Sequence, residues 1–379
     1  MTFRVGFEQT WRVVLTSRTL VSTMLLAVVL YAFYYPAPYA HETAQRLPVV
    51  LVDEEDSALT RELVRAVAAT RAVRIVERVA TMHEATDRLR RGAADGINLL
   101  PRGLARSLLT GAPGGGIGVW VNATYLLRAS AIGEGVSAAI EGVAERRIGP
   151  AARALGLRRP VRIIREPLFN PGAGYKDYVF PAVASVILQQ TLLFGAATFM
   201  AGRHERGHWR MGRAEFAGAW GAMTLIGVLA ALFYFGLVFW IQDVPRGGNI
   251  PALLVTVPFF AAAVAALGLW LGSLFDQAAR AVQVLAPTSV PLFFLTGAAW
   301  PLDQMPWWLA AVSHLAPSTL GVHLFVPLNE MGASLGEVAG SASGLVGLAA
   351  LYGGLAFFRL TRRGAPEERG RGGVRADGS

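Results

Sequence analysis

The chain has 379 residues, of which 53% are hydrophobic and 16% are charged, and it carries a formal net charge of +9 without any cysteine. Soluble domains carry about 25% charged residues, so the composition argues against an ordinary soluble enzyme, and it excludes disulfides, thiol nucleophiles and cysteine metal sites. The only lysine, Lys176, follows Tyr175 rather than a glycine, which excludes a phosphate-binding loop of the G-x-x-x-x-G-K-[ST] type.

The first 40 residues predict two different membrane elements. In residues 1–18, apolar side chains such as Phe7 and Trp11 alternate with charged ones such as Arg12. This pattern predicts an amphipathic helix that lies on the inner leaflet. The apolar stretch 19–40 that follows has no clear signal-peptidase site, so we expect an uncleaved membrane anchor rather than a removed signal peptide.

Residues 41–175 are polar enough to form a domain outside the membrane, and strand-like and helix-like segments alternate within them. Helices are expected after the capping residue Ser57, over Glu84–Arg91, near Pro101 and from about Tyr125. The strands are expected at Leu47–Val52, Val73–Val79, Gly96–Leu100 and Ile117–Val121. The acidic run Asp53–Asp56 either is a solvated turn before a helix or binds a cation, and the turn is favoured.

Charge-free apolar windows locate the remaining membrane segments. Six windows contain a credible spanning core, namely 19–40, 178–202, 216–242, 247–275, 281–302 and 338–358. A seventh window, 304–329, contains Pro306, Pro317 and Pro327. Because prolines at this density break helices, we interpret it as a broken hairpin or re-entrant element at one membrane face.

The arginines set the expected orientation. With six spans both termini lie on one side, and that side holds the arginines of the N-terminal segment, of the loop 203–213 and of the C-terminal tail. The short loops on the other side hold only Arg246. The positive-inside rule therefore predicts cytoplasmic termini and an inner-membrane, multi-pass protein, which makes a nucleic-acid partner unnecessary to explain the charge.

The expected fold class is a mostly α-helical polytopic membrane protein with six transmembrane helices and an α/β extracytoplasmic domain inserted between helices 1 and 2. The domain limits that follow are an interface helix at 1–18, transmembrane helix 1 at 19–40, the extracytoplasmic domain at 41–175, transmembrane helices 2–6 at 176–360 with an outer hairpin at 301–337, and a disordered, basic cytoplasmic tail at 361–379.

One motif suggests a different function. His204, Glu205 and His208 match H-E-x-x-H, in which two histidines on one helical face bind zinc and the glutamate activates water. The neighbouring glycines weaken a helix and the surrounding arginines oppose a dication, so we expect no metal here and keep a membrane-embedded zinc metalloprotease as an alternative. A non-transporting membrane receptor or scaffold is a second alternative.

Several short motifs in a fixed order resemble the integral-membrane permease of bacterial ATP-binding cassette (ABC) exporters, in the type-2 family with a large extracytoplasmic domain. They are Val49–Ser57, Gly96–Leu109, Phe169-Asn170-Pro171, Glu205-Arg206-Gly207, Thr296-Gly297, Trp300-Pro301, Met305-Pro306 and Ala316–Thr319. His208 departs from the small hydroxyl residue that the family usually has there. The resemblance implies a complex of two permeases, identical or different, with two separate ATPase subunits that bind ATP and Mg, and no cofactor in this chain.

The resemblance also assigns expected roles. The residues expected to couple to the ATPase are Arg12, Arg203, Glu205, Arg206, Gly207 and Arg210. The polar residues within spans expected to line the translocation path, each with helix-to-helix hydrogen bonding as its ordinary alternative, are Gln189, Gln190, Thr191, Thr198, Gln283, Thr288 and Ser289. The outer hairpin is marked by Trp300, Pro301, Met305, Pro306 and Pro317. The cargo and a periplasmic adaptor remain open.

Overall fold

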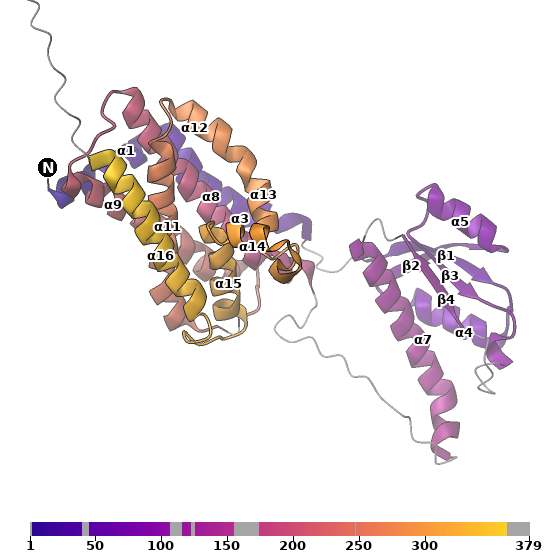
Figure 1. Cartoon of the computed structure of the whole chain (residues 1–379). Coiled ribbons are helices and arrows are strands. Elements are labelled where there is room, and N and C mark those ends of the chain that lie inside the picture. Colours follow the sequence, from indigo (N-terminus) through magenta and orange to yellow (C-terminus); the bar gives the residue numbers. More distant parts are fainter. Residues whose placement is uncertain are drawn as a thin grey trace, which may run out of the picture. The chain divides into compact units, whose positions relative to one another are not determined.

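The computed structural model divides the chain into two compact units, Met1–Pro38 with Lys176–Ser379 and, between them in sequence, Tyr39–Tyr175 (Figure 1). The residues it describes are 2–39, 45–106, 116–122, 126–154, 174–246 and 248–361. The Phe169-Asn170-Pro171 motif, the end of the 96–109 segment and the tail 362–379 lie outside these residues.

The unit formed from residues 45–154 is a four-stranded sheet with helices on both faces. The strands are β1 (Leu47–Asp53), β2 (Val73–Val79), β3 (Gly96–Leu100) and β4 (Gly118–Val121), in the order β2-β1-β3-β4. β1 pairs in parallel with β2 and β3, whereas β4 is antiparallel to β3. The helices are α4 (Ala58–Ala68), α5 (Met82–Arg90) and α7 (Leu126–Ala154).

Alternation along β1 separates the two apolar cores of this unit. Leu47 and Val49 pack with side chains of β2 and α7, while Val50 and Val52 pack with Ala85 of α5 on the other face. Successive side chains of a strand point to opposite faces, so one buried strand serves both layers. The strands and helices agree closely with those expected from the sequence.

The acidic turn after β1 is held by its own hydrogen bonds. The Asp53 carboxylate accepts the backbone N–H of Asp56 at 3.0 Å, and the Glu55 carboxylate accepts the N–H of Ala105 at 3.1 Å. Ser57 caps α4 by accepting the N–H of Thr60. These contacts favour the expected structural turn over a cation site, and no cluster of three potential metal ligands occurs in the described part of the chain.

The second unit is a bundle of apolar helices. Its N-terminal part is α1 (Phe3–Thr16), α2 (Arg18–Val21), η1 (Ser22–Leu26) and α3 (Ala27–Tyr34). It continues with α8 (Tyr175–Glu205), α9 (Arg213–Leu232), η3 (Phe233–Val238), α10 (Phe239–Ile241) and α11 (Ile250–Gly272). The next helices are α12 (Ala278–Leu285), η4 (Ala286–Thr288) and α13 (Ser289–Leu295). The unit ends with α14 (Trp307–Ser313), α15 (Pro317–Glu330) and α16 (Ala339–Thr361).

Length and hydropathy identify five of the described helices as candidate membrane spans, or up to seven if each of two bent pairs counts as one span. One bent pair is α1 with α2–α3, which meet at 84°, and the other is α14 with α15, which meet at 81°. The first angle fits an interface helix that leads into a spanning helix. The second shows the break that the prolines predict within 304–329.

The apolar windows extend beyond the ends of the helices that they contain. Within the window 247–275 the helix runs from Ile250 to Gly272, and the N–H of its C-terminal capping residue Ser273 donates to the carbonyl of Leu269. The window 281–302 ends at Leu295, and Gly297 then adopts a φ of 87°, which turns the chain away. The helix expected over 19–40 ends at Tyr34, two residues before Pro36.

The bundle has two ends that hydrogen bonds define. Arg359 donates to the carbonyl of Ser273, and the N–H of Met211 donates to the carbonyl of Leu360. We call this the terminal end, because the start of α1 and the end of α16 both lie there (Figure 1). At the far end, Lys176 donates to the carbonyl of Gln242.

Helix α8 lies at the centre of the bundle. Of its most apolar 18-residue window 89% is buried, against 11% for the window 278–295 and 33% for α16. A central helix must satisfy its polar side chains against neighbouring helices, whereas the exposed helices contact lipid or other chains. The polar residues of α8 are therefore the ones whose contacts matter most.

Candidate functional site

Close backbone contact joins α1 to α9 at the terminal end. A Cβ atom added to Gly218 would lie 2.4 Å from the carbonyl oxygen of Phe3 and 2.6 Å from the backbone nitrogen of Phe7. A Cβ atom on Gly6 would lie 2.8 Å from Glu215. Only glycine permits this approach, so α1 is seated on α9 by paired small residues of the kind that brings membrane helices together.

An ion pair ties α8 to α9 beside this contact. Arg203 Nη2 lies 2.7 Å from Glu215 Oε1, with side-chain exposures of 20% and 13%. The other carboxylate oxygen of Glu215 accepts the N–H of Gly212, which caps α9. A cleft of about 180 Å³ lies next to the pair and is also lined by Arg12 of α1. Two of the segments expected to couple to an ATPase, the N-terminal helix and the 203–213 loop, thus meet here.

The last turn of α8 is also connected to the start of α12 and to the segment just before it. Glu205 Oε2 accepts the N–H of Ala278 at 3.5 Å, and His204 Nδ1 lies 2.8 Å from the carbonyl oxygen of Phe275. The ring of Trp209 lies 5.4 Å from that of His204 in a tilted arrangement, and the guanidinium of Arg210 lies 4.9 Å from the centre of the Trp209 ring. The terminal end therefore joins the ends of several helices through direct side-chain contacts.

The geometry that a zinc site requires does not form at the H-E-x-x-H motif. Helix α8 ends at Glu205, and Gly207 turns the backbone with a φ of 74°. His208 lies beyond that turn, where its Nδ1 is 2.7 Å from the carbonyl oxygen of Arg206. The two histidines therefore do not share a helical face, and the motif does not support the protease alternative.

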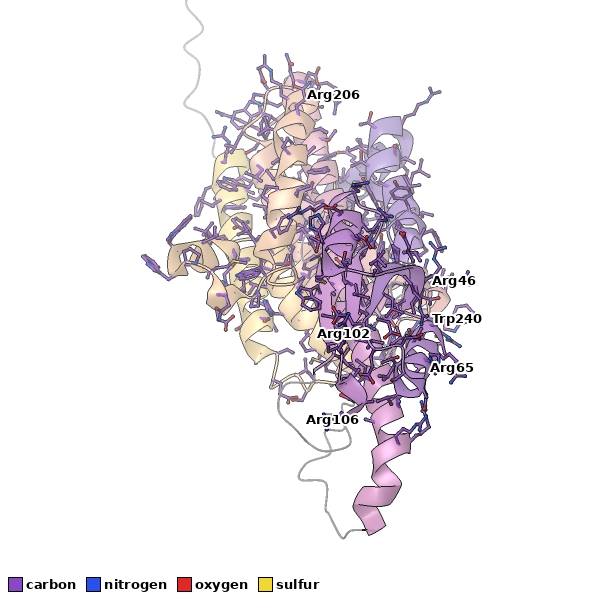
Figure 2. The ribbon with its side chains drawn as sticks, turned by 90° about the vertical axis from the view of Figure 1, so that its right-hand side faces the viewer. Arg46, Arg65, Arg102, Arg106, Arg206 and Trp240 are labelled. Carbon is purple, nitrogen blue, oxygen red and sulfur yellow. The ribbon has the colours of Figure 1, made fainter. Side chains whose placement is uncertain are left out.

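The remaining expected coupling residues are on the surface. Arg12, Arg206, Gly207 and Arg210 are exposed, and Figure 2 shows Arg206 at one extremity of the helical unit. Arg203 is the exception, because its side chain is only 20% exposed where it pairs with Glu215. The expected coupling set thus contains three exposed arginines available to a partner and Arg203, which holds α8 to α9. Its other two members, Glu205 and Gly207, contact α12 and turn the backbone after α8.

Sequence reasoning missed Glu215 and the glycine contact. A glutamate three residues after Gly212, at the start of an apolar helix, is a capping-box signal that could have been found. Gly218 lies four residues from both Ala214 and Ala222, which is the spacing of small residues typical of close membrane-helix contacts and could also have been noticed. The glycine contact itself becomes visible only when α1 and α9 are placed together.

Two adjacent glutamines in α8 contact two different helices. Gln189 is 1% exposed and its Oε1 accepts the backbone N–H of Ser318 at 2.6 Å, at the start of α15. Gln190 donates from Nε2 to Ser289 Oγ at 2.8 Å. Gln189 Nε2 and Gln190 Oε1 are buried without a partner in the described structure. Both side chains therefore form a hydrogen bond to another helix, and each retains one amide atom without a hydrogen-bond partner among the described residues.

The other expected path residues differ in their contacts. Thr191 and Thr288 each donate to a carbonyl of their own helical segment, at 2.8 and 2.6 Å, while Ser289 also donates to Ala286. Thr198 is buried and its Oγ1 has no partner among the described residues. Gln283 is exposed on α12. The structure brings only Gln190 and Ser289 of this set into direct contact.

The outer hairpin is a real break in the helical bundle. Trp300 is 59% exposed, and Pro301 and Pro306 are exposed beside it. Met305 is half-buried, and Pro317 is buried at the first position of α15, where its missing N–H costs nothing. Helix α15 begins beside Gln189, halfway along α8, and ends near the start of α11 at the far end of the bundle. The hairpin therefore returns to the far end, from which it came.

Comparison with known proteins identifies the family. A family model described as ABC-2 family transporter protein matches residues 17–358. Two curated relatives, both described as probable multidrug ABC transporter permease YbhR, come from Escherichia coli strain K12 and from Escherichia coli O157:H7. Each is 20% identical over 206 residues, which cover 52% of this chain and 55% of the relative.

The chain thus aligns over about half the length of the curated relatives it matches, whereas the family model covers most of the chain. The apolar helices described above are long enough to cross a membrane several times. This chain belongs to the ABC-2 transporter family, whose members are multi-pass permeases that lack a nucleotide-binding domain of their own.

Proposed function

We propose that this chain is the translocating subunit of an ABC exporter and that it is driven by a separate ATPase subunit. The observation that carries the proposal is the terminal end, where exposed arginines surround a direct contact network between α1, α8, α9 and α12. A partner that pushes on this network moves several membrane helices together. ATP and Mg bind to that partner, and this chain needs no cofactor.

The mechanism we infer is a shift between two arrangements of the bundle. Exposed Arg12, Arg206 and Arg210 contact an acidic surface of the ATPase, while Glu205 links the end of α8 to α12 through Ala278. Closure of two ATPase subunits on ATP displaces these contacts. The displacement reaches α8, whose Gln189 and Gln190 connect it to α15 and to α13.

We further infer six membrane crossings, with residues 307–330 as a re-entrant hairpin, in the bacterial inner membrane. Two copies of the permease, or two related permeases, enclose the path, because helix α12–α13 exposes Gln283 and buries little of its surface within one chain. Cytoplasmic termini place residues 45–154 in the periplasm, where a periplasmic adaptor can bind. The name of the relatives suggests drugs as cargo.

The proposal is tested by co-expressing the chain with the P-loop ATPase encoded by a neighbouring gene and reconstituting both in proteoliposomes. We expect co-purification and ATP hydrolysis that a panel of drugs stimulates. Arg206→Glu should reduce co-purification, because it reverses a charge at the contact surface. Arg246→Glu, a matched reversal outside the terminal end, should not. A chain that binds no ATPase, or one that hydrolyses ATP alone, would overturn the proposal.

A further inference from the structure

Two surface clefts meet at the elbow between α1 and the first spanning helix. The α1 cleft, of about 470 Å³, is lined by polar Glu8, Arg12 and Thr16 as well as apolar side chains. The elbow cleft, of about 260 Å³, is lined entirely by apolar side chains, among them Met24 and Leu229.

The clefts are continuous, because Trp11 and Leu15 of α1 line both of them. The same wall of α9 runs past both, with Leu225 in the α1 cleft followed by Ile226 and Leu229 in the elbow cleft. The joined groove therefore passes from a charged end on α1 to an apolar end between α3 and α9.

The charge at the polar end is positive. Glu8 is already neutralised by Arg4, whose Nε lies 2.7 Å from Glu8 Oε1. Arg12 is exposed, and within the described residues it has no ion-pair partner. One uncompensated guanidinium thus faces the α1 cleft, which suits a phosphate group.

The orientation of the groove also fits a lipid. α1 meets α2–α3 at 84°, so when α3 crosses the membrane α1 lies nearly parallel to its surface. The elbow cleft then descends from the surface into the hydrocarbon region along α3. Its rim, including Leu25 and Val29, is 39–44% exposed, which leaves it open to the bilayer.

We propose that this groove binds one anionic phospholipid, with its phosphate at Arg12 and one acyl chain in the elbow cleft between α3 and α9. A bound lipid would contact α1, α3 and α9 at once, and so would stabilise the seating of α1 on α9. Arg12 is also one of the residues proposed to contact the ATPase, so the lipid site is tested in the absence of that subunit.

The test measures lipid retained by the full chain, without any ATPase. The protein is exchanged into nanodiscs that contain equal amounts of phosphatidylglycerol and phosphatidylethanolamine, released into mild detergent and analysed by native mass spectrometry. We expect one retained phosphatidylglycerol. Arg12→Gln should lower its retention about fivefold, the effect of one arginine at an anionic lipid surface, and added salt should weaken the preference in the wild type.

Leu229→Trp should fill the elbow cleft and lower retention of both lipids. The matched controls are Arg213→Gln and Leu351→Trp, which change exposed residues outside both clefts and should retain lipid as the wild type does. Because Arg12 is exposed, its replacement tests the site even if Leu229→Trp fails to fold. The proposal is overturned if Arg12→Gln retains phosphatidylglycerol normally or if Arg213→Gln loses it equally.

These outcomes are separate from those of the proposed function. An ATPase segment in the groove would make Arg12→Gln lose ATPase binding while lipid retention stays unchanged, and that result would overturn the lipid site alone. Loss of drug-stimulated hydrolysis with normal lipid retention would instead count against the exporter.

Discussion

The side-chain oxygen of Gln189 accepts the backbone N–H of Ser318, one of the N–H groups that the first turn of α15 leaves without a partner in its own helix. Replacing it with the similarly shaped methionine would leave that N–H buried and unpaired. We expect Gln189→Met to destabilise the bundle by about 1–3 kcal/mol, measured as a lower apparent melting temperature in detergent by tryptophan fluorescence.

The matched control is Gln283→Met, since Gln283 is exposed on α12 and its replacement leaves no buried group unpaired. Its melting temperature should equal that of the wild type. Equal stability of both variants would show that Gln189 is not a cap for α15, and would return it to the set of residues free to line a path.

The Arg203–Glu215 pair is a second residue-scale prediction. With exposures of 20% and 13%, the pair is better shielded than a surface ion pair but still partly solvated. We therefore expect a double-mutant cycle of Arg203→Gln and Glu215→Gln to give a coupling energy of about 1–3 kcal/mol, from unfolding in detergent. A value near zero would mean that solvent screens the pair and that α8 and α9 are held by packing alone.

For single residues, the sequence predicted which polar side chains need partners better than it predicted which residues those partners are. It placed Gln189 and Gln190 among the polar residues of the spans, where amides are costly without partners. It could not find their partners, because Ser318 and Ser289 lie 129 and 99 residues away in the chain. For the same reason it grouped buried Thr198 with exposed Gln283.

At the scale of elements, the seating of α1 on α9 depends on Gly218. A side chain there would meet backbone atoms of Phe3 and Phe7 rather than flexible side chains, so the helices must separate. We expect Gly218→Val to free α1, which limited trypsin digestion in detergent should reveal as faster cleavage after Arg4 and Arg12.

The control is Gly347→Ala in α16, where a Cβ atom meets nothing within 4 Å. It should digest as the wild type does and gain slightly in helix stability. Unchanged cleavage of the Gly218→Val variant would mean that α1 is held by the membrane surface and not by α9.

The elements themselves were largely predictable because their signals are local. Ser57 caps α4 as its position before an apolar-periodic stretch predicts, and the proline-rich window 304–329 is broken where α14 gives way to α15. Helix ends were less predictable. The true ends at Gly272 and Leu295 are set by turns at Ser273 and Gly297, which apolar windows do not register.

For the whole molecule, the orientation in the membrane is given by the side that the terminal end faces. The start of α1, the 206–211 loop, Ser273 and the end of α16 gather there, so one measurement of sidedness fixes all of them together. The contact of Tyr178 with the carbonyl of Ala298 places the outer hairpin at the other end. Hydrophobicity alone could not give this pairing, because it leaves five to seven crossings open.

A chain without cysteine makes the sidedness directly measurable. We expect a membrane-impermeant maleimide to label Arg65→Cys and Asp303→Cys in intact spheroplasts, because cytoplasmic termini place both exposed positions outside. Arg206→Cys, at the terminal end (Figure 2), should be labelled only after the membrane is lysed. The unmodified chain provides the control without a reactive thiol.

Labelling of Arg206→Cys in intact spheroplasts would show that the topology is inverted and that the ATPase docking surface does not face the cytoplasm. Labelling of Asp303→Cys without Arg65→Cys would place these two positions on opposite sides of the membrane and would require an odd number of crossings between them.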